Sequence, residues 1–341
     1  MTRRPPPRPL PADAPARRRA LRAIGALGVA ASGCGGGSGG DLAGVGSGGT
    51  GQVAGSFATG PISGFGSVIV NGIRYDDGAA RIVDDADRAR TSTQLAIGMV
   101  VEVEGRADEA RGTGSADRIR LVSELRGTID AIDATTRRIR LLGATVQTGA
   151  ATVFPDAAGL AALAVGDRIE GYGFADRAGG LLRATCIERR AAGDADGRVK
   201  LRGLIAELDA ARGTFRIGTL LVDFRGLRGI LFTPSGGLRN GLLVSIESVA
   251  TPAAGAWRPD GEMTVLVAAA ATEGTLARVE GEILEFRSVA EFRVGGVPVD
   301  VRRACFGDGR TAAGLADDRR VRASGVFSGG LSGVAFGEGV R

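Results

Sequence analysis

Histidine is absent from the 341-residue chain, and other residues that commonly carry chemistry are scarce. Without imidazole, the protein lacks the commonest general base, the base of most catalytic triads and the commonest metal ligand. Aromatic residues make up only 4% of the chain, whereas glycine occurs 57 times. This composition predicts an all-β protein of short strands and turns. We expect a protein that is not an enzyme, with no catalytic residue, cofactor or metal site.

Cysteine is almost as rare, with Cys34, Cys186 and Cys305 far apart in the chain. No Cys-x-x-Cys spacing points to zinc or to a redox pair. Cys186 and Cys305 could form a disulfide in an oxidising compartment. The alternative, which we favour, is two separate small side chains buried in apolar surroundings.

Lysine occurs once, as Lys200, and we interpret the strong arginine bias as codon composition. The net charge of +5 depends on residues 1–33, which hold seven arginines and one acid. The remainder has 36 basic and 37 acidic residues. If the leader is removed, the electrostatic argument for binding nucleic acid disappears.

No apolar run reaches the ~20 residues of a membrane span. Residues 1–33 instead have the pattern of a signal peptide: basic residues at 17–19, an apolar run at 23–31, then Ala31-Ser32-Gly33 before Cys34. The pattern resembles a lipoprotein signal peptide, although the family prefers leucine at position 31. That resemblance implies that Cys34 is acylated and becomes the N-terminus. Residues 17–22 also resemble a twin-arginine signal, so the export route stays open.

Residues 34–56 are predicted to be the acylated cysteine followed by a flexible linker, because 35–55 are mostly glycine and serine. Gly35 directly after the cysteine resembles lipoproteins sent to the outer membrane. We expect the protein to lie in the cell envelope, anchored in the outer membrane and facing the periplasm.

One pattern, Leu-x-x-Gly-x-x-Val-x-Val-x-Gly, recurs in part or whole at four places with identical spacing, starting at Leu95, Leu163, Leu238 and Leu315. Its alternation predicts a strand with one buried face and one wet face. The residues expected to face a core are Val101, Val103, Ile169, Val244 and Ile246. The residues expected to face water are Glu102 and Ser245.

Further short strands precede and follow each copy of the pattern. Asn71-Gly72 indicates a type I′ hairpin turn, alanine-rich 157–164 a short helical turn, and Pro298 an edge or bulge. Five or six strands in each unit predict four tandem OB-like β-barrels, at 57–124, 125–197, 198–273 and 274–341. A β-sandwich shared by adjacent units is the alternative.

The segments 64–72 and 95–105 resemble an uncharacterised family, a domain of unknown function. Its members occur as tandem small β-barrels in secreted and lipid-anchored proteins of proteobacteria. The resemblance covers residues 57–341 and is strongest in the first two units, since Asp318 and Ala323 depart from the pattern in the fourth. It implies the fold but transfers no functional residue.

Three groups of residues could carry chemistry, and each has a plainer interpretation. Asp76, Asp77, Asp84, Asp85 and Asp87 could bind calcium, but a solvated acidic loop is favoured. The glycines of 64–67 could cradle phosphate, but a strand follows them, so a β-bulge or a sharp barrel corner is favoured. The aromatics Tyr75, Tyr172 and Trp257 lie in different units and form no repeated stacking platform.

The leading hypothesis is a lipid-anchored envelope protein with a non-catalytic binding or scaffolding role. Its partners would be the membrane, through the lipid on Cys34, and an envelope protein, a glycan or peptidoglycan. Nucleic acid is not expected. The rivals are a carboxylate-dependent envelope hydrolase and an OB-type binder of oligosaccharide or nucleic acid. Paired, desolvated carboxylates in one concave pocket would favour the hydrolase.

Overall fold

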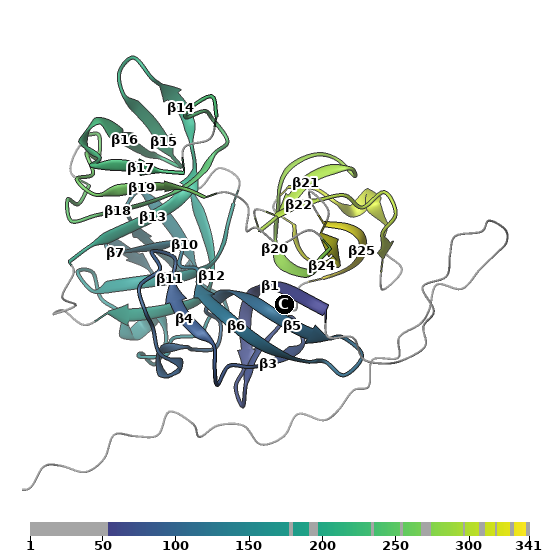
Figure 1. Ribbon diagram of the computed structural model, residues 1–341. Helices are drawn as coiled ribbons and strands as arrows, with labels where there is room; N and C mark the ends of the chain where they lie inside the picture. The colour runs from purple at the N-terminus through teal and green to yellow at the C-terminus, as the bar shows by residue number, and fades with distance from the viewer. Residues whose placement is uncertain are drawn as a thin grey trace, which may run out of the picture. The chain divides into compact units, whose positions relative to one another are not determined.

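The computed structural model describes residues 54–176, 180–190, 197–232, 235–252, 255–266, 274–295, 297–306, 311–317, 319–327 and 331–338. The predicted signal peptide, Cys34 and most of the predicted linker lie outside these residues. Within them every regular element is a β-strand or a single 3-10 turn, which confirms the all-β prediction (Figure 1). The same residues include no helix with the length and apolar character needed to cross a membrane.

The strands form four successive groups, which we call units one to four. Unit one has β1 (Ala54–Gly64), β2 (Val68–Val70), β3 (Ile73–Asp76), β4 (Arg81–Asp84), β5 (Val100–Asp108) and β6 (Thr113–Leu121). Unit two has β7 (Leu125–Thr128), β8 (Ala131–Asp133), β9 (Arg138–Leu141), β10 (Ala144–Gln147), β11 (Arg168–Ala175) and β12 (Leu181–Arg190). The linker predicted for 34–56 therefore ends earlier than expected, because β1 begins at Ala54.

Units three and four repeat this order. Unit three has β13 (Val199–Leu204), β14 (Ala206–Asp209), β15 (Thr214–Ile217), β16 (Leu220–Asp223), β17 (Gly229–Leu231), β18 (Leu243–Ser248) and β19 (Glu262–Val265). Unit four has β20 (Leu276–Ser288), β21 (Glu291–Val294), β22 (Val297–Val299), β23 (Cys305–Phe306), β24 (Arg320–Phe327) and β25 (Leu331–Glu338).

Strand pairing closes unit one on itself. β1 pairs antiparallel with β2, β2 with β3, and β5 with both β6 and β1, while β3 pairs parallel with β6. This circuit of five strands is the small closed barrel expected from the sequence. Unit four repeats the circuit, and its parallel closure joins β22 to β25 (yellow in Figure 1).

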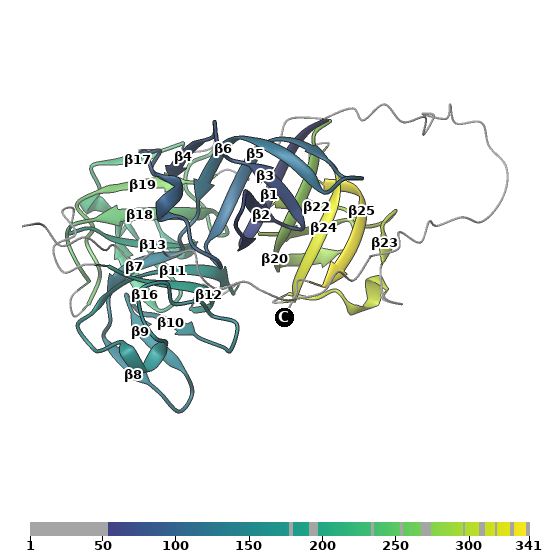
Figure 2. The ribbon, with the colours of Figure 1, turned by 90° about the horizontal axis from the view of Figure 1, so that it is seen from below.

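Units two and three repeat the circuit with their first strand divided in two. Figure 2 shows β8, β9 and β10 of unit two as a short meander, and β10 then pairs parallel with β12. In unit three a single bridge between Val222 and Trp257 makes the parallel closure. The repeated barrel pairing favours the OB-like prediction over the β-sandwich alternative.

Local turn chemistry follows the sequence closely. Asn71 and Gly72 both have positive φ, at 51° and 80°, as a type I′ turn requires. The pairing of β1 with β2 shifts register between Ile62 and Gly64, which confirms the predicted bulge. A 3-10 turn at Leu160–Ala162 confirms the helical turn predicted within 157–164. Pro298 lies in β22, where only Val299 pairs on the second side.

The units are joined through their first strands. The β1 segment Ser56–Thr59 pairs parallel with Leu276–Val279 of β20, so units one and four share one sheet. In the same way β7 pairs antiparallel with β13 and links units two and three. Each first strand thus covers a backbone edge that would otherwise be free to pair with another chain.

The predicted core positions are correct. Val101, Val103, Ile169, Val244 and Ile246 are all completely buried. The predicted wet face is wrong at Ser245, which is only 8% exposed. Glu102 is only partly exposed and forms an ion pair with Arg120.

Candidate functional site

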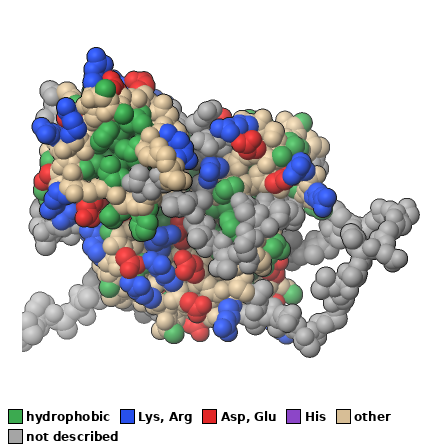
Figure 3. Space-filling view, turned by 45° about the horizontal axis from the view of Figure 1, so that its top comes forward, with side chains coloured by type: hydrophobic (Ala, Val, Ile, Leu, Met, Phe, Trp, Pro, Cys, Tyr) green, Lys and Arg blue, Asp and Glu red, His purple; other side chains and the backbone are tan. Residues whose placement is uncertain are grey.

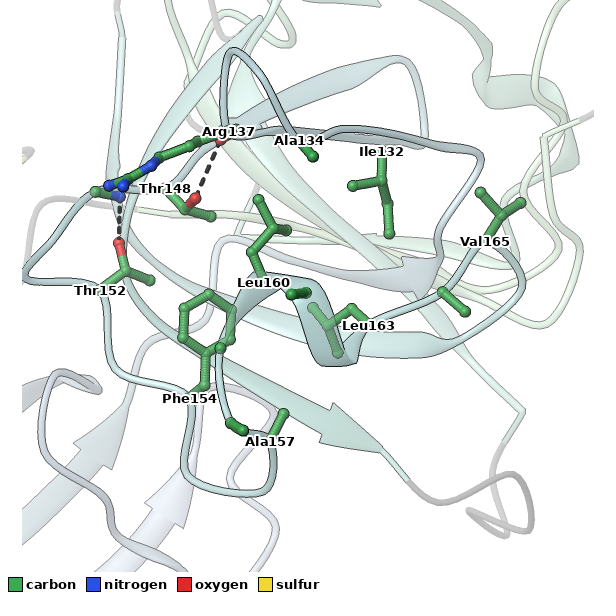
Figure 4. A pocket seen from close by; sticks show the side chains of 15 residues that line it. Ile132, Ala134, Arg137, Thr148, Thr152, Phe154, Ala157, Leu160, Leu163 and Val165 are labelled. Atoms are coloured by element: carbon green, nitrogen blue, oxygen red, sulfur yellow. Dashed lines mark hydrogen bonds between the residues drawn. The ribbon is translucent and has the colours of Figure 1, made fainter.

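A wide groove on unit two is a candidate binding site. It has a volume of about 930 Å³, within the range of small-molecule sites. Figure 4 shows its large apolar side chains, namely Ile132, Phe154, Leu160, Leu163 and Val165. Small residues complete the walls, mostly alanines and glycines between 157 and 164. The groove therefore suits a mainly apolar ligand.

Three segments of unit two form the groove: the end of β8 with its following turn, the end of β10, and the connection from 149 to 165. Hydrogen bonds fix these segments. The Thr148 hydroxyl donates to the Arg137 carbonyl at 3.1 Å. The Thr152 hydroxyl accepts from the Gly149 amide and donates to the Ala184 carbonyl, both at 2.8 Å. The walls are thus preformed, which lowers the entropy cost of binding.

The apolar side chains of the groove are only partly buried by their contacts with the core. Ile132, Phe154 and Leu160 pack against the hydrophobic core cluster of units two and three but remain half-buried. Val165 at the groove edge is 63% exposed. Burying such surface under a ligand would be favourable by about 25 cal/mol per Å² of apolar area.

Charge is confined to one end of the groove. Figure 4 shows Arg137 there with Thr148 and Thr152, while Ile132 and Val165 lie toward the other end. Arg137 is the only charged residue in the lining. Its side chain is exposed and has no carboxylate partner among the residues that the structure describes.

The equivalent turn of unit one does not reproduce this surface. Unit one has Ser92-Thr93-Gln94 where unit two has Leu160-Ala161-Ala162. Figure 3 shows hydrophobic side chains gathered over the part of the molecule formed by unit three. Leu231 and Phe232 of that unit are 42% and 71% exposed.

The acidic residues singled out from the sequence are not one solvated loop. Asp84 is buried and accepts hydrogen bonds from Arg88 at 2.8 Å and Arg90 at 2.9 Å. Burial opposes ionisation, but these donors hold the pKa of Asp84 below its ordinary value. Asp87 accepts hydrogen bonds from Arg81 and Arg118 on the surface. The solvated-loop interpretation is wrong for Asp84.

Asp85 belongs instead to a buried polar cluster that connects three units. It accepts a hydrogen bond from Lys200, whose ammonium also donates to Ser123 at 2.9 Å. Ser123 donates in turn to Glu170 at 2.7 Å. Glu247 contacts Arg88 at 2.8 Å and Arg126 at 3.4 Å. We call this set the junction cluster: Asp84, Asp85, Arg88, Ser123, Arg126, Glu170, Lys200 and Glu247. Across the described residues, no three His, Cys, Asp or Glu side chains form a group that could hold a metal ion.

Glu170 and Glu188 form an adjacent carboxylate pair that resembles the hydrolase arrangement. They are register partners on β11 and β12, and burial, with a further contribution from Glu170, raises the pKa of Glu188 above its ordinary value. Arg190 contacts both carboxylates, at 3.6 Å and 3.3 Å. The crevice beside them has a volume of only about 10 Å³. It has no room for a substrate, so the pair carries no catalytic proposal.

The singled-out aromatic residues are structural. Tyr75, Tyr172 and Trp257 are at most 2% exposed. The Trp257 indole donates to the Ala250 carbonyl at 2.8 Å. Burial raises the pKa of Tyr172, which packs with unit one although it belongs to unit two. No aromatic surface for stacking bases or sugars results from these three residues.

The cysteine prediction is half correct. Cys186 is completely buried and not disulfide-bonded, and burial raises the pKa of its thiol. Cys305 is exposed rather than buried, in β23 of unit four. Cys34 lies outside the described residues.

Sequence reasoning missed both the groove and the junction cluster. The alanine-rich segment predicts a helical turn, but Leu160 and Val165 in a surface connection also indicate exposed apolar surface. Composition alone gives the single lysine no role. Only the spatial approach of Lys200 to Asp85 shows its place, and these residues are far apart in sequence.

Residues 59–120 and 126–188 each match the model of a family described as Domain of unknown function (DUF5666). The two matches fall in units one and two, in tandem, and confirm the resemblance seen in the sequence. No curated protein matches the chain.

Proposed function

We propose that this chain is a lipid-anchored, non-catalytic binding protein of the cell envelope, with its ligand site in the groove of unit two. The observation that carries the binding role is the groove itself, which has a volume of about 930 Å³, a mainly apolar lining and a single cationic side chain at one end. A concave, mainly apolar lining with a few polar groups is the usual form of a small-molecule site. The other units act as the supporting body.

The anchoring part of the proposal comes from the sequence. Basic residues, a short apolar run and small residues precede Cys34, and a glycine-rich segment follows it. A cysteine carrying several acyl chains would bind a membrane stably. The segment from Gly35 to Val53 would then act as a tether for the body.

Replacement of Cys34 by serine tests the anchor. We expect the Cys34→Ser chain to accumulate as an unprocessed precursor that incorporates no labelled palmitate, whereas the parent chain is labelled and sediments with outer membranes. Cys305→Ser is the matched control and should be labelled normally. Labelling of the Cys34→Ser chain would overturn the anchor.

A photo-reactive amino acid tests the binding role in living cells. Placed at Val165, which edges the groove, it should give a covalent adduct. Placed at Phe65, which is 45% exposed in unit one and outside the groove lining, it should give none. No adduct at Val165, or equal adducts at both positions, would overturn the binding role. The mass of the adduct separates a small ligand from a protein partner.

A further inference from the structure

We infer that the ligand of the groove is an anionic amphiphile with a single acyl chain, bound as a monomer with its head group at Arg137. This rests on the proposed binding role of the groove and names the chemical class of its ligand. The groove is apolar along most of its lining and has one charged end. An amphiphile has the same division into an apolar chain and a charged head group. Phe154, Leu160 and Leu163 would contact the chain.

The charge of the head group follows from Arg137. Many other arginines of the described residues are neutralised by carboxylates, as Arg120 is by Glu102 and Arg183 is by Glu282. Among the described residues Arg137 has no such partner, and the groove lining contains no acidic residue. A carboxylate or phosphate would find a cation there without competing with an existing ion pair.

The lining favours an acyl chain over a peptide. A bound peptide brings backbone amides and carbonyls that need hydrogen-bond partners. The hydroxyls of Thr148 and Thr152, the polar side chains of the lining other than Arg137, are already bonded within unit two. The remaining side chains are apolar and offer no donors or acceptors. An acyl chain needs none.

The test uses the full-length chain carrying Cys34→Ser, produced without export, so that its own lipid does not contribute. Dansyl-labelled undecanoate, below its critical micelle concentration, should bind saturably with a blue-shifted emission. Oleate should displace it about threefold to fivefold better than oleyl alcohol, since an exposed ion pair is worth up to about 1 kcal/mol. Arg137→Gln should abolish that preference for the acid, while Arg140→Gln, an exposed arginine outside the groove, should keep it.

Filling the groove gives a second, independent readout. Ala161→Trp places a large side chain at an exposed position of the lining and should weaken binding at least about tenfold. Ala313→Trp changes the equivalent exposed position in the 3-10 turn Ala312–Gly314 of unit four and should leave binding unchanged.

Three results would overturn the inference: no saturable binding of the probe, equal displacement by acid and alcohol, or unchanged binding by Ala161→Trp. Adducts at Val165 would still support the binding role in each case, so failure of the ligand class and failure of the function are distinguishable. Binding to anionic vesicles alone, without binding of the monomeric probe, would also reject a monomer site.

Discussion

Lys200 shows how much of this protein depends on single residues that look unremarkable in the sequence. It is the only lysine, it is 1% exposed, and it lies on β13 of unit three. Its ammonium contacts Asp85 of unit one and Ser123 between units one and two. A buried charge needs a partner, so this contact constrains how three units meet.

Replacing Lys200 by methionine should destabilise unit three by about 3 kcal/mol, because it leaves Asp85 without its buried cation. Urea unfolding monitored by fluorescence of Trp257, the only tryptophan, reports on this unit. The double variant Lys200→Met with Asp85→Asn should lose less than the sum of the two single variants. Strictly additive losses would show that the pair does not couple the units.

Asp223 gives unit three a pH-dependent contribution to stability. Hydrogen bonds from Arg225, at 2.8 Å and 3.1 Å, lower the pKa of its carboxyl from 3.8 to about 2. A carboxyl whose pKa is lower in the folded than in the unfolded chain stabilises the fold at pH values above its unfolded pKa. This contribution is lost as the pH falls from about 4 to about 2. Asp223→Asn keeps a capping oxygen but removes the charge, so its melting temperature should approach that of the parent chain over this window. A difference that stays constant with pH would contradict the assignment.

At the scale of elements, alternation along the repeated strand predicted the barrel interior correctly and the outside incorrectly. Val244 and Ile246 are buried because residues two apart share one face of a strand. The opposite face, which includes Ser245, is expected from the alternation to be wet. Instead Arg88 of unit one reaches Glu247 at 2.8 Å. A pattern within one unit cannot show that another unit will cover its polar face.

The repeated glycine of the motif meets two requirements: a positive φ in its own turn and, at Gly98, a close approach to the backbone of another unit. Gly98, Gly166 and Gly241 all have φ between 84° and 93°, which explains the glycine in three units. At Gly98 a Cβ would also lie 2.3 Å from the Thr185 carbonyl oxygen of unit two. A Cβ added at Gly166 would have no other residue within 4 Å apart from its chain neighbours.

Alanine at these two glycines should therefore have different costs. Gly166→Ala meets only the backbone strain, about 1 kcal/mol. Gly98→Ala adds a clash with the backbone of unit two and should cost about 3 kcal/mol in total. Thermal unfolding of the full chain followed by circular dichroism compares them. Equal losses would mean that the approach of Gly98 to Thr185 does not constrain the protein.

At the scale of the whole molecule, the sequence predicted the repeated barrel but not its joining. Hairpin turns and alternation are local signals, and they were sufficient for the strand order within each unit. The pairing of β1 with β20 joins segments more than 200 residues apart and leaves no periodic trace. The groove escaped prediction for a related reason, since its lining comes from three separate segments of unit two.

This joining makes unit one dependent on unit four, which truncation after Leu266 should reveal. Phe57 of β1 is 3% exposed and belongs to the hydrophobic cluster of unit four. Without β20, the edge at Ser56–Thr59 and the Phe57 ring would be open to another chain, so the truncated Cys34→Ser chain should dimerise. Light scattering coupled to size exclusion should detect this.

Lysine at the open edge should reverse the association. We expect Phe57→Lys to return the truncated chain to a monomer, because a charge on an edge strand opposes pairing with a second copy. Phe65→Lys introduces the same charge at an exposed residue outside the β1–β20 pairing and should leave the dimer intact. A monomeric truncated chain, or equal effects of both lysines, would show that unit four does not act as the cover of this edge. The first and last units are therefore predicted to protect each other, although the family match covers only the first two.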